Sequence, residues 1–432
     1  MLSYQQAREV VITRVKSLVL TSASETIALQ DSLGRVLARE IRSDRDYPPF
    51  ERSIRDGYAV RSTDTVPGAK LRLIGELKAG DTPAVAVTPG TCIQIMTGAA
   101  LPNGADAVIM VEHTSCDGDS IQVDRQIKLG QHVVRRGSEQ SAGQTVIAAG
   151  SRMGFAQIAA AAQVGAAQIS VTRKPKIAIL TTGDEIVDFA GTPGQFQIRN
   201  SNSASLAAQV SILAAEPIVI GNAKDTVDDL RAKISTGFES DMLLLSGGVS
   251  MGKYDLVEPV LRELSSEIIF DAVAIRPGKP VVFAICKGKP VFGLPGNPVS
   301  TMVTFDLFVR PAVDILSGEL QPRPLSLLDA VLTTSLSEKP GLTHFLPSVL
   351  ECGSAATAFA AETNPESQQR EPGFSTPSVS FTQSPPRVSP VPWQGSGDVV
   401  AMSRANCLLV VPPDRENIEA GERVQVLLRG LC

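Results

Sequence analysis

The feature that most constrains the fold is the alternation of short apolar runs with helical stretches between Lys176 and Ser317. Apolar runs typical of buried strands occur at 176–180, 217–220 and 242–245, and helical periodicity follows them at 203–215, 227–235 and 256–264. Residues 281–285 and 291–294 predict two strands around a Lys-Gly-Lys turn, and 299–316 a long final helix. Alternation of this kind predicts a mostly parallel sheet covered by helices on both faces.

The rest of the chain has a different character. With 432 residues it is too long for one hydrophobic core, and about two to four domains are expected. Residues 3–20 predict a capped amphipathic helix, 70–147 a series of short strands and 152–166 a second helix. Gly353 to Pro392 is rich in Ser, Pro, Thr and Gln, which is typical of a disordered insert.

The predicted domains are therefore four. They are an N-terminal helical linker domain (1–47 and 140–175), an inserted β-rich domain (48–139), an α/β domain (176–318) and a C-terminal β domain (319–432) with the low-complexity insert at about 353–392.

The amino-acid composition excludes some classes of binding partner. The net charge is −5 and the isoelectric point is near 5.5, so no overall basic field exists to attract nucleic acid or a membrane surface. Six cysteines are scattered without a CxxC pair, and three histidines are too few for a histidine-rich metal centre. No apolar run approaches the length of a membrane helix, and the N-terminus lacks signal-peptide character. We expect a cytoplasmic protein with no nucleic-acid or membrane partner.

Three of the predicted strands end in glycine-bearing sequences. They continue into TTGDE at 181–185, SGGVSMG at 246–252 and PGNP at 295–298. Each alone is most simply a tight turn between strand and helix. Because such sheets bind ligands at the carboxyl ends of their strands, and glycine lets backbone amides approach a phosphate, the three together predict a phosphate-bearing anionic ligand. The sequence contains no GxxxxGK[ST] motif, which excludes a P-loop ATPase.

Acidic side chains are expected at the same edge of the sheet, namely Asp184, Glu185, Asp225 and Asp255. Because carboxylates repel phosphate, we interpret them as ligands of a bridging magnesium ion or as partners of substrate hydroxyls and amines. Helix capping is the alternative; it accounts for Asp255 but poorly for adjacent Asp184 and Glu185. The RPGKP turn at 276–280 carries two cations, which either clamp an oxyanion or point into solvent.

Further motifs occur outside the α/β segment. They are RDGYA at 55–59, MTGA at 96–99, RGSE at 136–139, SAG at 141–143, NSN at 200–202 and QGSG at 394–397. Together with TGDE, SGGVS, PGKP and LPGNP, they resemble the motifs of the molybdopterin molybdenumtransferases, the MoeA and gephyrin E-domain family. The resemblance covers nearly the whole chain except the insert.

This resemblance implies a multidomain α/β homodimer with a three-layer αβα molybdopterin-binding domain and a C-terminal small β-barrel. It implies insertion of molybdate, a substrate, into adenylylated molybdopterin, with Mg²⁺ as cofactor and release of AMP. It also implies the molybdopterin adenylyltransferase and acceptor molybdoenzymes as partners. Whether molybdenum or tungsten is loaded stays open.

Site residues follow from the positions of the matching motifs. The catalytic residues would be Asp56, Glu185, Asp225 and Asp255. Mg²⁺ would be held by Asp184, Glu185 and Asp225. Asp56 and Thr97 would face the α/β domain of the other subunit. The substrate-binding residues would be Thr97, Gly98, Thr182, Gly183, Asp184, Ser246, Gly247, Gly248, Ser250, Arg276, Pro277, Gly278, Lys279, Pro295, Gly296, Asn297, Pro298 and Ser396.

The sequence also departs from the family pattern. Glu139 stands where the family usually has Asp, and Ala272 where a second lysine often precedes the PGKP motif. Residues 342–347 (LTHFLP) lack the two arginines that the family carries around its Thr-x-Phe core. Arg387 and Arg404 are the candidates to replace them.

Two other functions remain open. An adenylyltransferase that acts on molybdopterin with ATP would use the same TTGDE and SGGVS turns, but the 55–59 and 96–99 motifs and the C-terminal β domain argue against it. A non-catalytic molybdopterin-binding scaffold would fit the missing arginines, whereas the retained acids argue for an enzyme.

Overall fold

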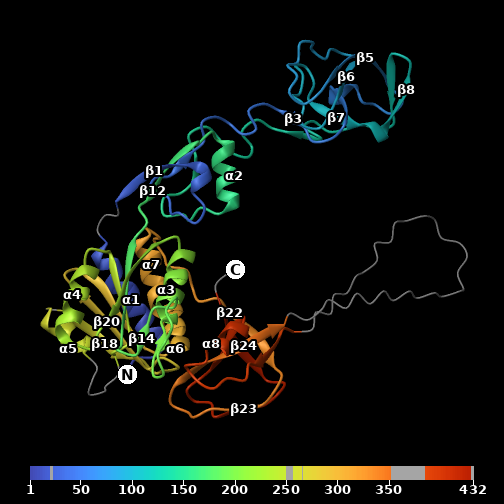
Figure 1. The fold of residues 1–432 in the computed structure, drawn as a ribbon. Helices are drawn as coiled ribbons and strands as arrows, with labels where there is room; N and C mark the ends of the chain where they lie inside the picture. The colour runs from blue at the N-terminus through green and yellow to red at the C-terminus, as the bar shows by residue number, and fades with distance from the viewer. Residues whose placement is uncertain (20–22, 250–255, 265, 352–384, 430–432) are drawn as a thin grey trace, which may run out of the picture. The chain divides into compact units, whose positions relative to one another are not determined.

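The structure is a computed structural model that describes residues 1–19, 23–249, 256–264, 266–351 and 385–429. The chain divides into two compact units, Ser24–Val171 and a larger unit of Met1–Ala23 with Thr172–Cys432 (Figure 1). Among the residues that the structure describes, no helix combines the length and the apolar character that crossing a bilayer requires.

A six-stranded sheet in the order β16-β13-β17-β21-β20-β18 forms the centre of the larger unit. Its strands are β13 (Lys176–Thr182), β16 (Glu216–Ala223), β17 (Met242–Ser246), β18 (Glu267–Ala272), β20 (Pro280–Cys286) and β21 (Lys289–Leu294). The first four strands in the sheet order run parallel, whereas β20 and β18 are antiparallel additions. The predicted mostly parallel sheet is confirmed, and so is the strand pair around the Lys-Gly-Lys turn.

Helices cover both faces of this sheet because successive side chains of a strand point to opposite sides. Ile177 and Ile179 of β13 lie in one apolar core with α1, α3, α6 and α7. Ala178 and Leu180 lie in a second core with α4 and α5. The result is a three-layer αβα arrangement. The helices are α1 (Tyr4–Leu18), α3 (Ser201–Ile212), α4 (Val227–Gly237), α5 (Val257–Glu263), α6 (Pro298–Thr304) and α7 (Arg310–Leu316).

Helix α1 confirms the predicted N-terminal helix but not its predicted neighbours. It begins with a capping box, in which Gln6 N donates to Ser3 Oγ at 3.2 Å and Ser3 N donates to Gln6 Oε1 at 3.0 Å. Its buried stripe, which includes Val11 and Val15, packs in the α/β core against α7. The grouping of 1–47 with 140–175 was wrong for this helix, because an apolar stripe does not specify which core will bury it.

The predicted final helix is interrupted between α6 and α7 by a π-helical turn, η4 (Phe305–Val309). Pro311 has no N–H, so it cannot donate to the Leu307 carbonyl as the fourth residue along an α-helix would. Arg8 Nη1 of α1 donates to this carbonyl at 3.0 Å, and Arg8 Nη2 donates to Arg323 O at 2.6 Å. The arginine therefore joins α1 to the irregular helix.

Five strands at the end of the chain close a small barrel, as predicted. Strand β24 pairs with both β25 and β26, and the ring continues through β22 and β28. A short strand, β19 (Ile275–Arg276), pairs with β24 and connects the α/β domain to the barrel. The barrel strands are β22 (Leu327–Leu332), β24 (Thr343–Glu351), β25 (Arg387–Pro390), β26 (Cys407–Val411) and β28 (Arg423–Leu428). The pair β23 (Leu336–Ser337) and β27 (Asn417–Ile418) and helix α8 (Val399–Arg404) accompany them.

The end of the predicted insert belongs to this barrel. Strand β25 pairs with β22 and β24, and its Val388 is fully buried. A prediction from Ser and Pro content was wrong here, because an Arg-Val-Ser-Pro strand is held mainly by its backbone ladder. Residues 353–384 of the predicted insert lie outside the described residues.

The unit Ser24–Val171 contains a six-stranded sheet in the order β7-β4-β6-β5-β9-β8, which matches the predicted β-rich segment. Beside it in sequence, β1 pairs with β12 and β2 with β11, around a core that includes helix α2 (Phe155–Gln163). That part was predicted as helical, and in the structure it is mixed. The strands are β1 (Ser24–Ala28), β2 (Ile41–Arg42), β3 (Arg52–Ser53), β4 (Gly57–Val60), β5 (Lys70–Leu77), β6 (Thr91–Ile95), β7 (Ala107–Met110), β8 (Thr114–Asp117), β9 (Ser120–Val123), β10 (Val133–Val134), β11 (Thr145–Ile147) and β12 (Gln168–Thr172).

Candidate active site

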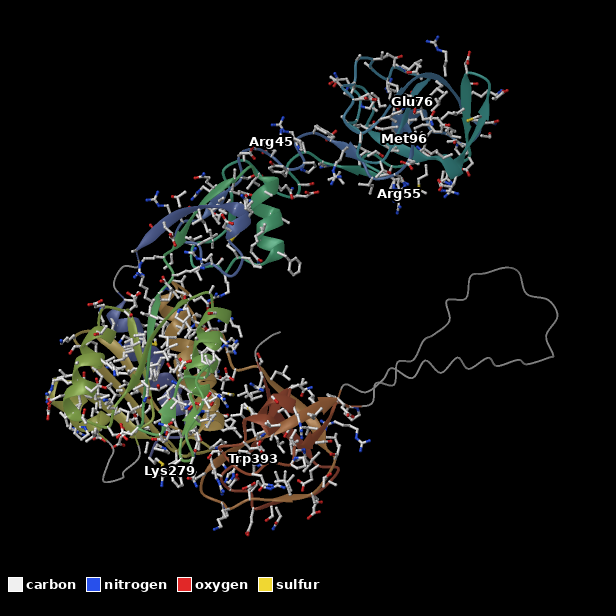
Figure 2. The ribbon with its side chains drawn as sticks, viewed as in Figure 1. Arg45, Arg55, Glu76, Met96, Lys279 and Trp393 are labelled. Carbon is white, nitrogen blue, oxygen red and sulfur yellow. The ribbon has the colours of Figure 1, made fainter. Side chains whose placement is uncertain are left out.

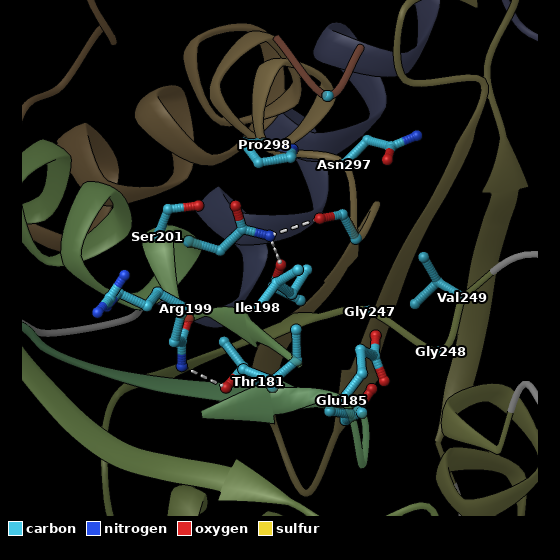
Figure 3. Close-up of a pocket in the computed structure, with 18 of the residues that line it drawn as sticks. Thr181, Glu185, Ile198, Arg199, Ser201, Gly247, Gly248, Val249, Asn297 and Pro298 are labelled. Carbon is cyan, nitrogen blue, oxygen red and sulfur yellow. Dashed lines mark hydrogen bonds between the residues drawn. The ribbon is translucent and has the colours of Figure 1, made fainter. Parts of the chain in front are cut away.

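A pocket of about 620 Å³ lies at the carboxyl ends of β13, β17 and β21 (Figure 3). Strand register explains why the three predicted turns meet there. Thr181 lies opposite Ser246, and Ser246 lies opposite Leu294, so all three strands end at the same level. The structure brings together the following predicted residues in the pocket wall: Thr182, Gly183, Glu185, Asp225, Ser246, Gly247, Gly248, Gly296, Asn297 and Pro298.

The turn after β17 requires glycine. Gly247 has a φ of +98° and Gly248 a φ of +64°, in the region that other residues rarely adopt. A Cβ atom on Gly247 would lie 2.8 Å from the Thr182 carbonyl oxygen, and one on Gly248 would lie 3.0 Å from Thr182 Oγ1. The β17 turn therefore passes directly beside the end of β13.

Two asparagines hold the start of α3 against these turns. Asn202 Nδ2 donates to Ser246 Oγ at 2.9 Å and to Gly296 O at 2.7 Å (Figure 3). Asn200 caps α3 by accepting from Ser203 N at 3.0 Å, and its Nδ2 donates to Thr181 Oγ1 at 2.8 Å. The N-terminal turn of α3 thus lines the pocket, where its N–H groups favour an anion.

Two short paired strands bring the chain back to the pocket before α3 begins. Strand β14 (Ile186–Val187) pairs with β15 (Ile198–Arg199), and both border the pocket. Arg199 therefore lines the wall although sequence reasoning did not select it. The NSN motif at 200–202 is part of the family resemblance, but its residues are not among the predicted site residues. The signal that could have found them is an asparagine cap on the first helix that follows a predicted ligand turn.

Of the four predicted acids, two line the pocket. Glu185 and Asp225 line the pocket, whereas Asp184 does not, and Asp184 Oδ1 accepts from the Asp225 backbone N–H at 3.2 Å. Within the described part of the chain, no three Asp, Glu, His or Cys side chains come close enough together to hold a metal ion. The predicted trio of Asp184, Glu185 and Asp225 is therefore not a preformed metal cluster.

The cationic turn lies outside the pocket wall. Arg276 and Lys279 are exposed, Pro277 and Gly278 between them are buried, and none of the four lines the pocket (Figure 2 shows Lys279). Gly278 has a φ of +103°, and a Cβ atom there would meet Thr304 Cγ2 at 2.6 Å.

Two further predicted residues lie just behind the wall. Ser396 Oγ accepts from Asn297 Nδ2 at 2.9 Å, and the Pro295 carbonyl accepts from Ser246 Oγ at 3.2 Å. Each therefore contacts a residue that lines the pocket but does not line the pocket itself.

Asp56, Thr97 and Gly98 belong to the smaller unit. Thr97 donates to Asp56 Oδ1 through its backbone N–H at 2.7 Å and its hydroxyl at 2.8 Å. These two hydrogen bonds, the backbone one first, hold the pKa of the Asp56 carboxyl below its ordinary value. The Gly98 N–H donates to Ser53 O at 2.9 Å. Two other predicted residues, Ser250 and Asp255, lie outside the described residues.

The structure also shows the surroundings of the residues that depart from the family pattern. Glu139 Oε1 pairs with Arg52 Nη2 at 3.0 Å. His344 is buried in β24, with its Nδ1 2.9 Å from Glu338 Oε2. Arg387 and Arg404, the suggested replacements for the missing arginines, are both exposed.

The chain matches known proteins along most of its length. Residues 2–165 match the family model of the MoeA N-terminal region (domain I and II), 178–314 that of a probable molybdopterin binding domain, and 377–428 that of the MoeA C-terminal region (domain IV). The chain is 30% identical to a molybdopterin molybdenumtransferase of Staphylococcus aureus (strain MRSA252), over 96% of this chain and 94% of the relative. It is 30% identical to a protein of the same name from Bacillus subtilis (strain 168), over 94% and 90%.

Solved structures agree with these matches. The molybdopterin biosynthesis MoeA protein of Pyrococcus horikoshii is 31% identical, covers 99% of both chains and superposes with a TM-score of 0.74. A second structure of a MoeA protein from Pyrococcus horikoshii OT3 gives a TM-score of 0.75 at 25% identity, with 99% of this chain covered. The chain therefore belongs to the MoeA family of molybdopterin molybdenumtransferases, transferases of molybdenum cofactor biosynthesis.

Proposed function

We propose that this chain inserts molybdate into the dithiolene of adenylylated molybdopterin and releases AMP in a Mg²⁺-dependent reaction. In this reaction water attacks the adenylyl phosphoanhydride, so that AMP leaves and the pterin keeps its own phosphate. The two dithiolene sulfurs bind the metal of the oxyanion, and one oxygen of molybdate leaves as water. The observation that carries the proposal is the make-up of the pocket. The turns after β13, β17 and β21 and the start of α3 line it together with two carboxylates, Glu185 and Asp225.

The backbone at the strand ends would bind the phosphoryl groups. Gly247 and Gly248 have no side chain to block approach, and the first turn of α3 presents N–H groups. Asn202 fixes the turns after β17 and β21 relative to α3 through its two hydrogen bonds. The pocket is therefore already shaped before the ligand enters, which lowers the entropy lost on binding.

Glu185 and Asp225 would hold the magnesium ion together with oxygens of the substrate. Mg²⁺ is commonly bound by one or two carboxylates plus substrate phosphates, so the absence of a three-ligand cluster among the described residues fits this mode. When bound, the ion would neutralise charge that develops on the phosphoanhydride oxygens. Without it, the two carboxylates would repel the substrate.

The remaining assignments rest on the family. We propose a homodimer in which Asp56 and Thr97 of one subunit act with the α/β pocket of the other, and Arg276, Lys279 and Ser396 contact phosphate or molybdate. The molybdopterin adenylyltransferase and acceptor molybdoenzymes are the proposed protein partners. A cytoplasmic location stays a prediction from the scattered cysteines and the charge balance.

Two parallel reactions separate this function from its rivals. Adenylylated molybdopterin with molybdate should yield AMP, whereas molybdopterin with Mg-ATP should yield no pyrophosphate. Pyrophosphate in the second reaction would identify an adenylyltransferase. No product in either reaction, with the adenylylated pterin nevertheless bound, would identify a scaffold. The variant Asp255→Asn tests one assigned acid, because undiminished AMP release would remove this residue from the catalytic set.

A further inference from the structure

The charged side chains of the pocket are separated along its length. Glu185 and Arg199 extend toward different ends in Figure 3, and both line the wall. Asp225 lies close to Glu185, because the backbone N–H of Asp225 donates to Asp184, the residue before Glu185. Among the described lining residues, Arg199 is the single lysine or arginine. The pocket therefore has an acidic end and a cationic end.

The fold holds Arg199 from both sides. Its backbone pairs with Val187 in the β14–β15 ladder, and the next residue, Asn200, caps α3. The guanidinium is itself oriented, because Arg199 Nε donates to the Gly191 carbonyl at 3.2 Å. One of its five N–H groups is thus used, and the planar group is kept in place for a second partner.

Arg199 differs in its surroundings from other arginines of the same domain. Arg231 pairs with Asp228 and Glu263, and Arg262 pairs with Glu258. Within the described residues, Arg199 makes no ion pair with a carboxylate. An exposed arginine beside a helix N-terminus, with no acid to neutralise it, raises the local potential for an anion.

We propose that Arg199 binds a phosphoryl group of the substrate through its guanidinium and so fixes where the diphosphate of the substrate lies in the pocket. This inference rests on the proposed function and deepens it. A phosphoanhydride-linked nucleotide carries its negative charge on phosphoryl oxygens, which match the arginine fork in a bidentate contact. The same oxygens are repelled by Glu185 and Asp225 unless a cation lies between. A diphosphate can therefore lie across the pocket, with one phosphoryl group at the cationic end and the other at the cation-bridged acidic end.

The test compares Arg199→Gln with Arg199→Lys and with Arg231→Gln, a control arginine outside the pocket. Loss of a charge-assisted hydrogen bond should raise the KM for adenylylated molybdopterin roughly 10- to 100-fold in Arg199→Gln. kcat should change less than KM, because the contact is made in the ground state as well. Arg199→Lys should recover part of the loss, and Arg231→Gln should leave KM unchanged. Raising the salt concentration should weaken binding of the unmodified chain more than that of Arg199→Gln.

AMP binding, measured by calorimetry, gives a readout that does not depend on turnover. We expect Arg199→Gln to weaken AMP binding in the same proportion as it raises KM. An unchanged KM together with unchanged AMP affinity would overturn the inference while leaving the proposed function intact. A lower melting temperature with a salt-independent change in KM would also overturn it, because that result describes an arginine that merely holds the 188–197 loop through Gly191. Absence of molybdate-dependent AMP release by the unmodified chain would instead refute the proposed function.

Discussion

Asn202 and Ser246 are joined by a hydrogen bond of 2.9 Å from the asparagine Nδ2 to the serine Oγ, and the same Nδ2 donates to the Gly296 carbonyl at 2.7 Å. A single amide thus links the first turn of α3 to the turns after β17 and β21. Residues separated by 44 and 94 positions in the sequence are held together in one wall of the pocket.

Asn202→Ala should therefore impair binding more than folding. We expect KM for adenylylated molybdopterin to rise about tenfold and the free energy of unfolding to fall by about 1 kcal/mol, the usual net value of such contacts. Asn406 is a matched control, because it exchanges two hydrogen bonds with Leu350 in the barrel, at 2.7 and 3.0 Å. Asn406→Ala should lose similar stability with KM unchanged. A normal KM in Asn202→Ala would contradict this assignment.

Gly247→Ala should remove most activity. The new Cβ would lie 2.8 Å from a backbone oxygen of Thr182, and the residue would have to keep a φ of +98°. Strain of this kind costs about 1–3 kcal/mol, or else the turn shifts and the pocket changes shape. Gly288→Ala is the control, since Gly288 has a φ of +73° but nothing within 4 Å of the new atom. It should lose at most about 1 kcal/mol of stability and retain kcat/KM. Equal activity of the two variants would show that crowding at Thr182 is unimportant.

Arg8→Ala should destabilise the larger unit. The change leaves the Leu307 and Arg323 carbonyls without this donor, and a carbonyl that is buried like that of Leu307 costs about 1–3 kcal/mol when it has no partner. Arg14 lies on the same helix, and its side chain forms an exposed ion pair with Glu267, so Arg14→Ala should change the free energy of unfolding by less than about 0.5 kcal/mol. Urea denaturation of both variants measures the difference, and similar midpoints would argue against a role for Arg8 in joining α1 to the π-helical turn.

Thr97→Val should raise the pKa of Asp56. The hydroxyl bond disappears and the backbone bond remains, so the pKa should move part of the way back to the ordinary aspartate value. Because the folded-state pKa is lowered, the stabilising contribution of this carboxylate is present above the ordinary pKa and is lost as pH falls through the folded pKa. Titration of the carboxyl carbon signal by NMR measures the shift. An identical titration midpoint in the two proteins would mean that the threonine hydroxyl does not stabilise the charged form.

The strand ends could be predicted from the sequence because parallel pairing places all carboxyl ends at one edge. Thr182, Ser246 and Gly296 accordingly meet in the pocket. Arg199 could not be found this way, since β15 is two residues long and has no apolar period. The position of α1 and the strand β25 were missed for a related reason. Both depend on partners distant in sequence, the Leu307 carbonyl for Arg8 and the β22 and β24 ladders for residues 387–390.

The acidic residues show that a local sequence pattern does not determine which side chains line the pocket. Adjacent Asp184 and Glu185 were assigned together, yet in the structure Glu185 lines the pocket and Asp184 accepts from the Asp225 backbone. Neighbouring side chains after a strand diverge, because the chain is already turning. Sequence spacing alone does not reveal which of the two turns inward.

The stoichiometry of AMP release tests the central claim most directly. Adenylylated molybdopterin, molybdate and Mg²⁺ are incubated with the purified chain. The amounts of AMP and of pterin-bound molybdenum are then measured in the same sample. The account predicts one AMP for each molybdenum bound and no release without molybdate or with Mg²⁺ chelated. It also predicts a rate roughly a hundredfold lower in Glu185→Gln, which removes a proposed magnesium-binding carboxylate. AMP release that proceeds equally well without molybdate, or molybdenum insertion that leaves the adenylyl group in place, would contradict it.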